Sequence, residues 1–156
     1  MAGEQAVRLA TVGDAEVVAT LLHDFNTEFD TPSPGSSVLA PRLRVLLAGD
    51  STFAILAGHP AVGLALVTLR TNVWYDGLVA LLDELYVVPD RRSEGIGSAI
   101  IGRLMAVAHE RGVDLIEINV DEGDVDAQRF YARHGFSPTE PGSSERAHYW
   151  FQELTG

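Results

Sequence analysis

The sequence contains no cysteine and no lysine, and all 11 of its basic residues are arginine. Without cysteine the chain can form neither a disulfide nor a thiolate metal site. It has no apolar run approaching the ~20 residues of a membrane span. Residues 1–7 also lack the basic and apolar regions of a signal peptide. These absences favour a cytoplasmic protein.

Acidic residues outnumber basic ones by 22 to 11, which gives a net charge of −11. Proteins that bind nucleic acids or anionic membranes concentrate Lys and Arg, so we expect neither partner. The same charge favours a cationic partner, although acidity also serves solubility. The apolar fraction of 46% argues against disorder. At this length we expect a single domain over residues 1–156.

Hydrophobic spacing predicts a strand and two helices at the start of the chain. Pro32, Pro34 and Gly35 separate the helices, because proline and glycine prevent a helix from continuing. The predicted elements are a strand at Ala6–Ala10, a helix that opens at Asp14 and carries apolar residues to Phe25, and a helix capped by Ser36 or Ser37 and stopped by Gly49.

Three apolar runs follow and predict strands at Phe53–Ala57, Val62–Thr71 and Leu78–Val88. Gly58-His59-Pro60 is a turn signal, so the first two runs are predicted to form a hairpin. Pro89 ends the third run, since proline cannot donate to a sheet ladder.

The second half alternates between helices and strands. The predicted elements are a helix at Gly97–Arg111, a strand at Val113–Val120, a helix from Asp124 or Asp126 to His134, and a final strand at His148–Phe151. A strand, a helix and a further strand imply a right-handed crossover and a parallel pair. The predicted fold class is therefore α/β, with a mixed, mostly antiparallel sheet, one parallel strand pair and helices on both faces.

The turn between Val88 and the following helix has the composition of an anion site. Gly95 and Gly97 allow a tight turn and a close approach to a ligand. The helix directs unpaired N–H groups and its positive dipole end at the turn, and Arg92 adds a charged fork. Neither a P-loop nor a dinucleotide fingerprint is present. By itself the turn fits either an ordinary tight turn or a site for a different phosphate-bearing ligand.

Two spaced motifs flank the predicted strand at 113–120. Arg92-x-x-Gly95-x-Gly97 follows a strand, and the second motif consists of Ala127, Phe130, Tyr131, Gly135 and Phe136. The first resembles the Arg/Gln-x-x-Gly-x-Gly/Ala loop of the GNAT superfamily of acyl-CoA-dependent N-acyltransferases. The second is similar to that family's Asn-x-x-Ala-x-x-(apolar)-Tyr signature with its Gly-Phe. The order of elements is also similar over nearly the whole chain.

The resemblance implies acetyl-CoA as co-substrate, with its pyrophosphate in the glycine turn and its pantetheine arm along the preceding strand. The implied cofactor-binding residues are Tyr86, Val87, Val88, Arg92, Ser93, Glu94, Gly95, Ile96, Gly97, Ser98 and Asp124. Two residues depart from the family pattern. Glu94 brings a negative charge to the turn, where we expect it to face solvent, and Asp124 replaces an Asn and cannot donate a hydrogen bond.

Acetyl transfer to an amine needs a base for the amine proton and a proton for the departing thiolate. Asp83 and Glu84 are two acids in an apolar strand, and burial raises the pKa of a carboxyl group. Strict alternation would put them on opposite faces of the sheet. We expect Glu84 to be the base, with Asp83 or water as alternatives and a structural salt bridge as the other explanation. Tyr131 resembles the family's proton donor to sulfur.

In the family, the acceptor pocket is built from the first helix pair and the loop before the fourth strand. Phe25–Asp30 and Asn72–Gly77 correspond to these segments and combine aromatic rings with carboxylates, which suits an ammonium group. A solvated helix end, a capped helix start and a core tryptophan would explain the same residues. The expected substrate-binding residues are Glu28, Asp30, Trp74, Tyr75 and Asp121.

The expected function is direct acetyl transfer from acetyl-CoA to a primary amine of a small cationic substrate. The spacing Gly123-Asp124-x-x-Ala127 and the Phe-x-x-Glu-Phe-Asp helix end are loosely similar to those of aminoglycoside N-acetyltransferases. An aminoglycoside-type sugar, a polyamine or an amino-acid derivative would fit. The alternatives are a protein or peptide N-acetyltransferase and a non-catalytic acyl-CoA-binding module. The five histidines lack metal-ligand spacing, so we expect no metal. The predicted strand at His148–Phe151 offers a pairing edge for a homodimer.

Overall fold

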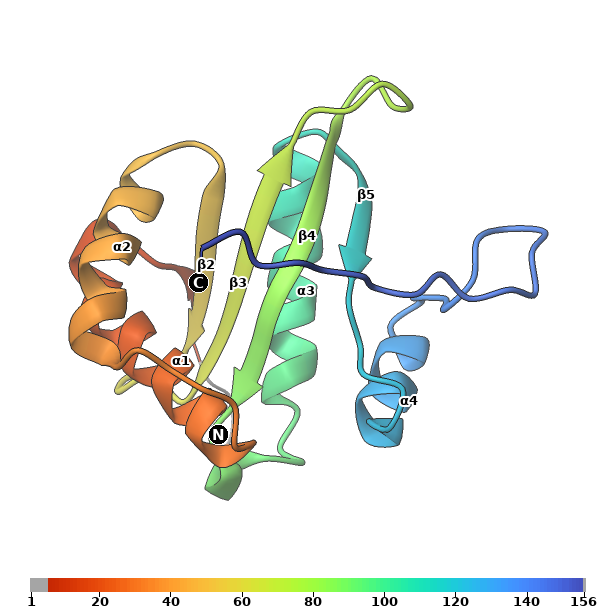
Figure 1. The fold of residues 1–156 in the computed structure, drawn as a ribbon. Helices are drawn as coiled ribbons and strands as arrows, with labels where there is room; N and C mark the ends of the chain where they lie inside the picture. Colours follow the sequence, from red (N-terminus) through yellow and green to blue (C-terminus); the bar gives the residue numbers. More distant parts are fainter. Residues whose placement is uncertain (1–5, 156) are drawn as a thin grey trace. The chain divides into compact units, whose positions relative to one another are not determined.

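Five strands form one sheet in the order β1-β2-β3-β4-β5 (Figure 1). The structure is a computed structural model that describes residues 6–155. The pairs β1–β2, β2–β3 and β3–β4 are antiparallel, whereas the pair β4–β5 is parallel. The predicted mixed sheet with one parallel pair is therefore confirmed. Its strands are β1 (Val7–Leu9), β2 (Thr52–Ala57), β3 (Gly63–Arg70), β4 (Leu78–Val87) and β5 (Val113–Ile118).

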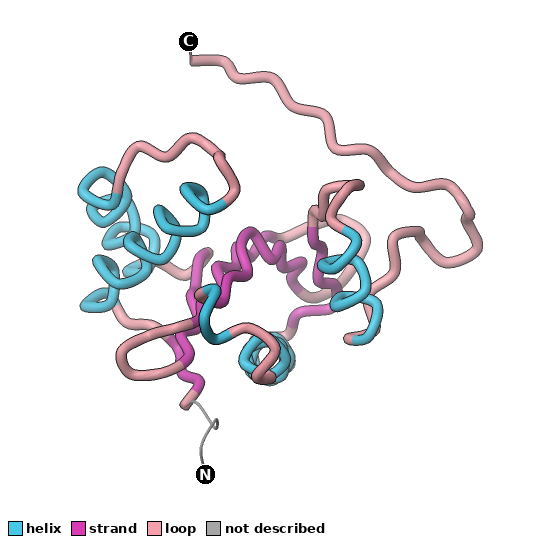
Figure 2. The backbone as a smooth tube through the Cα atoms, turned by 90° about the horizontal axis from the view of Figure 1, so that it is seen from below, coloured by secondary structure: helices cyan, strands magenta, loops and turns pink. Residues whose placement is uncertain are grey.

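Helices cover both faces of this sheet (Figure 2). On one face lie α1 (Ala15–Glu28) and α2 (Ser36–Ala48), whose apolar side chains pack with Leu56, Leu64 and Tyr86 of the sheet. On the other face lies α3 (Ile96–Glu110), which approaches β3 closely at Gly63. A Cβ atom at Gly63 would lie 2.9 Å from Cδ1 of Ile100, so a larger residue there would require the Ile100 side chain to shift.

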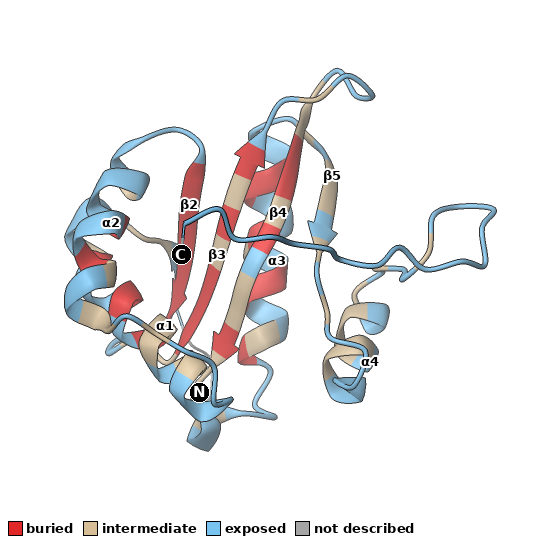
Figure 3. Cartoon of the chain, viewed as in Figure 1, coloured by how far each residue is buried: buried red, intermediate tan, exposed pale blue. Residues whose placement is uncertain are grey.

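The core sits at the central strands, where both faces of the sheet are covered. Every residue of β2 is buried, as Figure 3 shows, and most of β3 is buried too. Double coverage explains why these strands are continuous apolar runs rather than alternating ones. At the far edge, β5 has only half-buried and exposed positions.

The helix ends follow the sequence with one exception. Asp14 is the N-cap residue of α1, as predicted, although its side chain does not bond to the helix. Its carboxylate instead accepts hydrogen bonds from the Arg8 guanidinium at 2.8 and 3.0 Å and from Thr11 N at 2.7 Å. The predicted Ser36 or Ser37 cap of α2 is wrong, because Gly35 holds the N-cap position and Ser36 is already helical. Single 3-10 turns, η1 (Val12–Asp14) and η2 (Pro89–Arg91), precede α1 and α3.

The chain divides into two compact units, Met1–Ile118 with the sheet and Asn119–Gly156. In the second unit, α4 (Val125–Arg133) begins after Asp124, whose carboxylate accepts a hydrogen bond from Ala127 N at 3.0 Å. The predicted strand at His148–Phe151 is wrong, because these residues belong to no strand. The aromatic residues Tyr149, Trp150 and Phe151 favour an extended backbone, but a strand also requires a hydrogen-bonded partner. The edge expected for a homodimer is therefore not a preformed strand.

Candidate active site

The turn from β4 to α3 has the geometry of an anion cradle. Ser93 and Gly95 adopt left-handed backbone conformations, with φ of 64° and 82°, and Gly95 is the N-cap of α3. The first hydrogen bond of the helix runs from Ala99 N to Gly95 O at 3.0 Å. The N–H groups of Ile96 and Gly97 come before this bond, at the positive end of the helix dipole. Such groups suit a phosphate or pyrophosphate.

Glu94 is paired within this turn. Its side chain is exposed, as the sequence predicts, and Nε of Arg91 lies 3.1 and 3.2 Å from its two carboxylate oxygens. The pair offsets the negative charge that Glu94 brings to the anion cradle.

Arg92 connects the same turn to the end of α1. Its Nη1 and Nη2 atoms each lie 2.7 Å from a carboxylate oxygen of Glu28, and its Nε donates to Val87 O at 2.9 Å. The guanidinium also lies 5.7 Å from the Tyr86 ring centre. The Arg92 guanidinium lowers the pKa of Glu28, whereas burial and Glu28 raise the pKa of Tyr86. Arg92, predicted to bind phosphate, and Glu28, predicted to bind the amine substrate, are thus hydrogen-bonded to each other.

The second half of β4 has one edge without a ladder partner. β5 pairs with β4 only from Leu78 to Leu82, whereas β3 pairs with β4 as far as Val87. Among the described residues, none therefore continues the β5-side ladder along residues 83–87. An extended, amide-bearing ligand can hydrogen-bond to such an edge as an added strand would. The predicted cofactor residues Tyr86 and Val87 lie on this part of β4.

A β-bulge brings Asp83 and Glu84 to one face of the sheet. The pairing register shifts between Leu66 and Val67 of β3, so that Glu84 lies opposite Leu66 and Asp83 has no partner of its own. Leu66 packs on the α1–α2 side of the sheet. Thr68, two residues further along and therefore on the same face, donates from Oγ1 to Oδ2 of Asp83 at 2.5 Å. The expected opposite-face arrangement is therefore wrong, because strict alternation fails where an extra residue is inserted.

Glu84 is the candidate base with a perturbed titration. It is half-buried, and burial raises its pKa, with a further contribution from the neighbouring charge of Asp83. A carboxylate with a raised pKa is a better proton acceptor near neutral pH. Both acids directly follow Leu82, where the β4–β5 ladder ends, and so lie at the open edge of β4.

The two predicted acceptor segments lie at opposite ends of β4 (Figure 1). The ring of Phe25 stacks on the ring of Tyr86, with 4.9 Å between their centres, and Tyr86 is the second-last residue of β4. Residues 72–77, in contrast, come just before the first residue of β4. Ten residues of strand span about 30 Å. The structure therefore brings Glu28 close to the cofactor turn but does not bring it to Trp74. Asp30 is exposed just after α1.

The loop at residues 72–77 is tied by its own polar groups. Oδ1 of Asn72 accepts hydrogen bonds from Trp74 N at 2.7 Å and Tyr75 N at 2.8 Å, and Oδ2 of Asp114 accepts one from Gly77 N at 2.7 Å. Trp74 is 85% exposed, which excludes the core-tryptophan explanation. Asp114 and Thr68 are organising residues that the sequence pattern did not reveal, because their partners are remote in sequence. The partners of Asn72, in contrast, lie within the same loop.

In the second unit the predicted residues have local structural partners. Asp124 caps α4, and the Asp121 carbonyl accepts hydrogen bonds from Asp124 N and from the Gln128 side chain, at 3.0 and 3.1 Å. The Tyr131 ring contacts Phe130 and Phe136 edge to face. The roles of Asp121, Asp124 and Tyr131 toward a ligand stay predictions.

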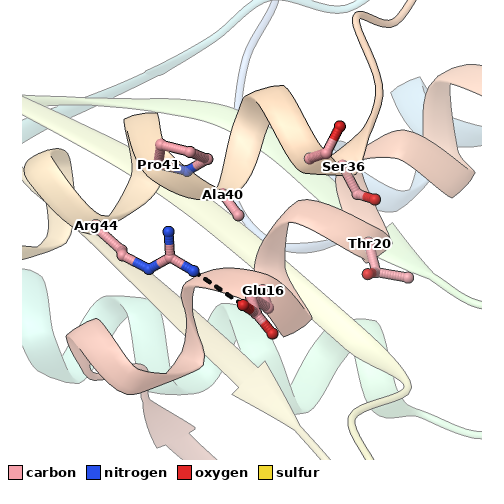
Figure 4. A pocket seen from close by; sticks show the side chains of 7 residues that line it. Glu16, Thr20, Ser36, Ala40, Pro41 and Arg44 are labelled. Carbon is pink, nitrogen blue, oxygen red and sulfur yellow. Dashed lines mark hydrogen bonds and ion pairs between the residues drawn. The ribbon is translucent and has the colours of Figure 1, made fainter.

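A separate hollow of about 360 Å³ lies between α1 and α2 (Figure 4). An ion pair between Glu16 and Arg44, 2.9 Å apart, crosses it. None of the predicted site residues lines this hollow. Its lining residues are Glu16, Thr20, Ser36, Ser37, Ala40, Pro41 and Arg44.

Comparison with known proteins identifies the family. Residues 18–136, more than half of the chain, match the profile described as the Acetyltransferase (GNAT) family. The chain belongs to the GNAT acetyltransferase family. It is an N-acetyltransferase, and members of the family take the acetyl group from acetyl-CoA.

Three similar proteins illustrate the range of this GNAT family. A crystal structure from Arthrobacter sp. FB24, of a protein assigned as an acetyltransferase, is 50% identical with a TM-score of 0.90 and 99% coverage of both chains. The aminoalkylphosphonate N-acetyltransferase of Salmonella typhimurium is 25% identical over 135 residues, which are 83% of each protein. An aminoglycoside acetyltransferase from an uncultured soil sample, in complex with sisomicin, shares the fold with a TM-score of 0.77 at 20% identity and 96% coverage of both chains.

Longer relatives also contain this GNAT sequence pattern. The chain spans 27% of the length of one curated N-acetyltransferase that it matches. Among residues 6–155, no helix is long and apolar enough to cross a membrane. In that same part of the chain, no three acidic, histidine or cysteine side chains gather in a way that could hold a metal ion.

Proposed function

We propose that this GNAT enzyme transfers the acetyl group of acetyl-CoA directly to a primary amine of a small cationic substrate, with Glu84 as the base. The observation that carries the proposal is the position of the bulge. Asp83 and Glu84 share one face of the sheet immediately beyond Leu82, where β4 loses its β5 partner. A carboxylate with a raised pKa thus adjoins the edge that can accept an extended ligand.

The chain's own residues provide two kinds of contact for acetyl-CoA, which would supply the reactive acetyl thioester. The N–H groups of Ile96 and Gly97, at the start of α3, would hold the pyrophosphate. The open edge of residues 83–87 would hold the amide-bearing arm. The donor set fits an anion because Arg91 offsets the charge of Glu94. Ser93, Val88 and Ser98 flank these contacts and stay within the proposed cofactor site.

Glu84 would take a proton from the ammonium form of the substrate and leave a neutral amine. The nitrogen lone pair then forms the C–N bond, the C–S bond breaks, and its electron pair leaves with sulfur. A proton delivered to that sulfur, for which the sequence predicts Tyr131 as the donor, yields the free thiol. The proton that the attacking nitrogen loses as it becomes an amide passes through solvent to the tyrosine oxygen, so the step balances. The chain has no cysteine that could carry the acetyl group, which supports direct transfer.

The acceptor class rests on charge and on relatives. A net charge of −11 and two carboxylates on one face of the sheet favour a cation over an anion or a neutral ligand. One relative is named for aminoalkylphosphonates, and one structure of the same fold holds the aminoglycoside sisomicin. We infer a small amine, with aminoglycoside-type sugars, polyamines and amino-acid derivatives as the first substrates to test.

The test is release of CoA thiol from acetyl-CoA across a panel of these amines and of peptides with free amino groups. Turnover of small amines supports the proposal. Turnover of peptides alone would instead indicate a protein N-acetyltransferase, and acetyl-CoA binding without thiol release would indicate a non-catalytic module.

The role of Glu84 is tested with the best amine of that panel. Glu84→Gln should lose activity near neutral pH and recover part of it as the pH rises, because the amine then deprotonates unaided. Glu110→Gln, an exposed change at the end of α3, is the matched control. An unchanged pH–rate profile for Glu84→Gln would remove Glu84 as the base.

A further inference from the structure

Thr68 is a polar residue in the apolar strand β3, and its hydroxyl crosses to the bulge of β4. It lies opposite Leu81 in the ladder, yet its Oγ1 donates to Oδ2 of Asp83, two residues further along β4, at 2.5 Å. Thr68 is half-buried, whereas Asp83 is exposed. The bond therefore joins a half-buried hydroxyl on β3 to an exposed carboxylate on β4.

This bond bears on Glu84, because the bulge puts Asp83 and Glu84 next to each other on the same face. Extended strands normally separate the side chains of adjacent residues onto opposite faces. At the bulge the two carboxylates are instead neighbours, and the Thr68 hydroxyl determines where one of them points.

We propose that Thr68 is a positioning residue of this enzyme, whose hydroxyl holds the Asp83 carboxylate beside Glu84 so that the two acids act as a pair. This inference rests on the proposed function of Glu84 as the base. Asp83 is the nearby charge that, after burial, raises the pKa of Glu84. Thr68 acts through Asp83 and has no contact with a reacting atom in the proposal.

Several other charged groups around this face are paired with one another. Arg70 of β3 and Glu117 of β5 form an ion pair at 2.6 Å, and Glu28 of α1 is bonded to Arg92. Helix α3 packs on the opposite face. Asp24 of α1 acts on Tyr86, and neither Asp24 nor any of the paired groups is among the causes of the raised pKa of Glu84.

Thr68→Val keeps the shape of the side chain and removes the hydroxyl. Asp83 is then released toward solvent, its negative charge moves away from Glu84, and the pKa of Glu84 falls. We expect the titration midpoint of Glu84 to fall by about half a pH unit. The acid limb of the kcat/KM profile should move to lower pH by the same amount. Thr68→Ser retains the hydroxyl and should restore the wild-type midpoint.

The decisive measurement is an NMR titration of the Glu84 side-chain carboxyl in the full chain, which needs no turnover. It compares wild type, Thr68→Val, Thr68→Ser, Asp83→Asn and the Thr68→Val/Asp83→Asn double variant. Asp83→Asn should lower the midpoint, and adding Thr68→Val to it should change nothing further. If the Val variant does not fold, Thr68→Ala carries the same expectation.

An unchanged Glu84 midpoint in Thr68→Val, or a shift that persists in the Asp83→Asn background, would overturn the inference. Failure of the proposed function has a different signature, since Glu84→Gln would then leave the pH–rate profile unchanged whatever the NMR titration shows. A shifted midpoint together with an unchanged acid limb would support the Thr68 contact and contradict Glu84 as the base.

Discussion

The carboxylate of Glu28 and the guanidinium of Arg92 meet in two hydrogen bonds of 2.7 Å each, across 64 positions of sequence. The pair connects the end of α1 to the turn that precedes α3. The sequence assigns these residues to different ligands, the acceptor for Glu28 and the cofactor for Arg92. In the structure, Glu28 instead holds Arg92 while Arg92 holds the end of β4 through Val87 O.

Glu28→Gln should therefore weaken the binding of acetyl-CoA more than the binding of the amine. Loss of the charged pair releases Arg92, and the KM for acetyl-CoA should rise roughly threefold to tenfold while kcat at saturation changes little. Steady-state kinetics with each substrate varied in turn measure the split. Glu16→Gln removes a comparable exposed pair with Arg44 elsewhere on α1 and should leave both KM values unchanged. A rise confined to the KM of the amine would show that Glu28 binds the acceptor.

Tyr131→Phe should lower kcat by about tenfold or more, because the predicted proton donor to the leaving thiolate is removed. The dissociation constant of acetyl-CoA, measured by calorimetry, should change less than kcat does. Tyr149→Phe, at an exposed tyrosine of the same unit, is the control. A large loss of acetyl-CoA affinity with kcat preserved would assign Tyr131 to binding or packing instead.

Asp14 should make stability depend on pH. The Arg8 guanidinium and Thr11 N–H hold the pKa of the Asp14 carboxyl well below its usual range. A lowered folded-state pKa adds stability that is fully present above the unfolded-state value of about 4 and is lost as the pH falls below it. Asp14→Asn should thus cost about 1–2 kcal/mol at pH 7 and less at pH 3.

Urea unfolding of wild type and Asp14→Asn at the two pH values measures this difference. Asp50→Asn, at an exposed position before β2, should show no such dependence. An equal loss for Asp14→Asn at pH 7 and pH 3 would mean that the ionised pair with Arg8 is not the cause.

Gly77→Ala should destabilise the fold by about 2–4 kcal/mol. A Cβ atom there would lie within van der Waals radii of Gly112 O and of the Asp114 carboxylate, which already accepts Gly77 N–H. Gly102→Ala is the matched control, because nothing lies within 4 Å of its Cβ position on α3 and alanine favours the helix by up to about 1 kcal/mol. Equal unfolding midpoints in urea for the two variants would contradict this packing.

The elements with local signals were predictable. Apolar periodicity indicated the helices and the strands β2 to β5 to within a few residues, and Gly95 with Gly97 marked the turn into α3. Such features depend on residues close to each other in the sequence, so their pattern can be read directly from it. The final strand at His148–Phe151 was predicted wrongly, because a run of aromatic residues favours an extended backbone but cannot supply a partner strand.

The sequence by itself determined the family, the anion cradle at the start of α3, and the unusual pair of acids in β4. Only the tertiary structure decided that Asp83 and Glu84 share a face, because a bulge depends on the register with β3. It also joined Glu28 to Arg92 and separated Trp74 from both by the length of β4. These relationships form between elements brought together by burial of the core, and no local pattern in the chain encodes their geometry.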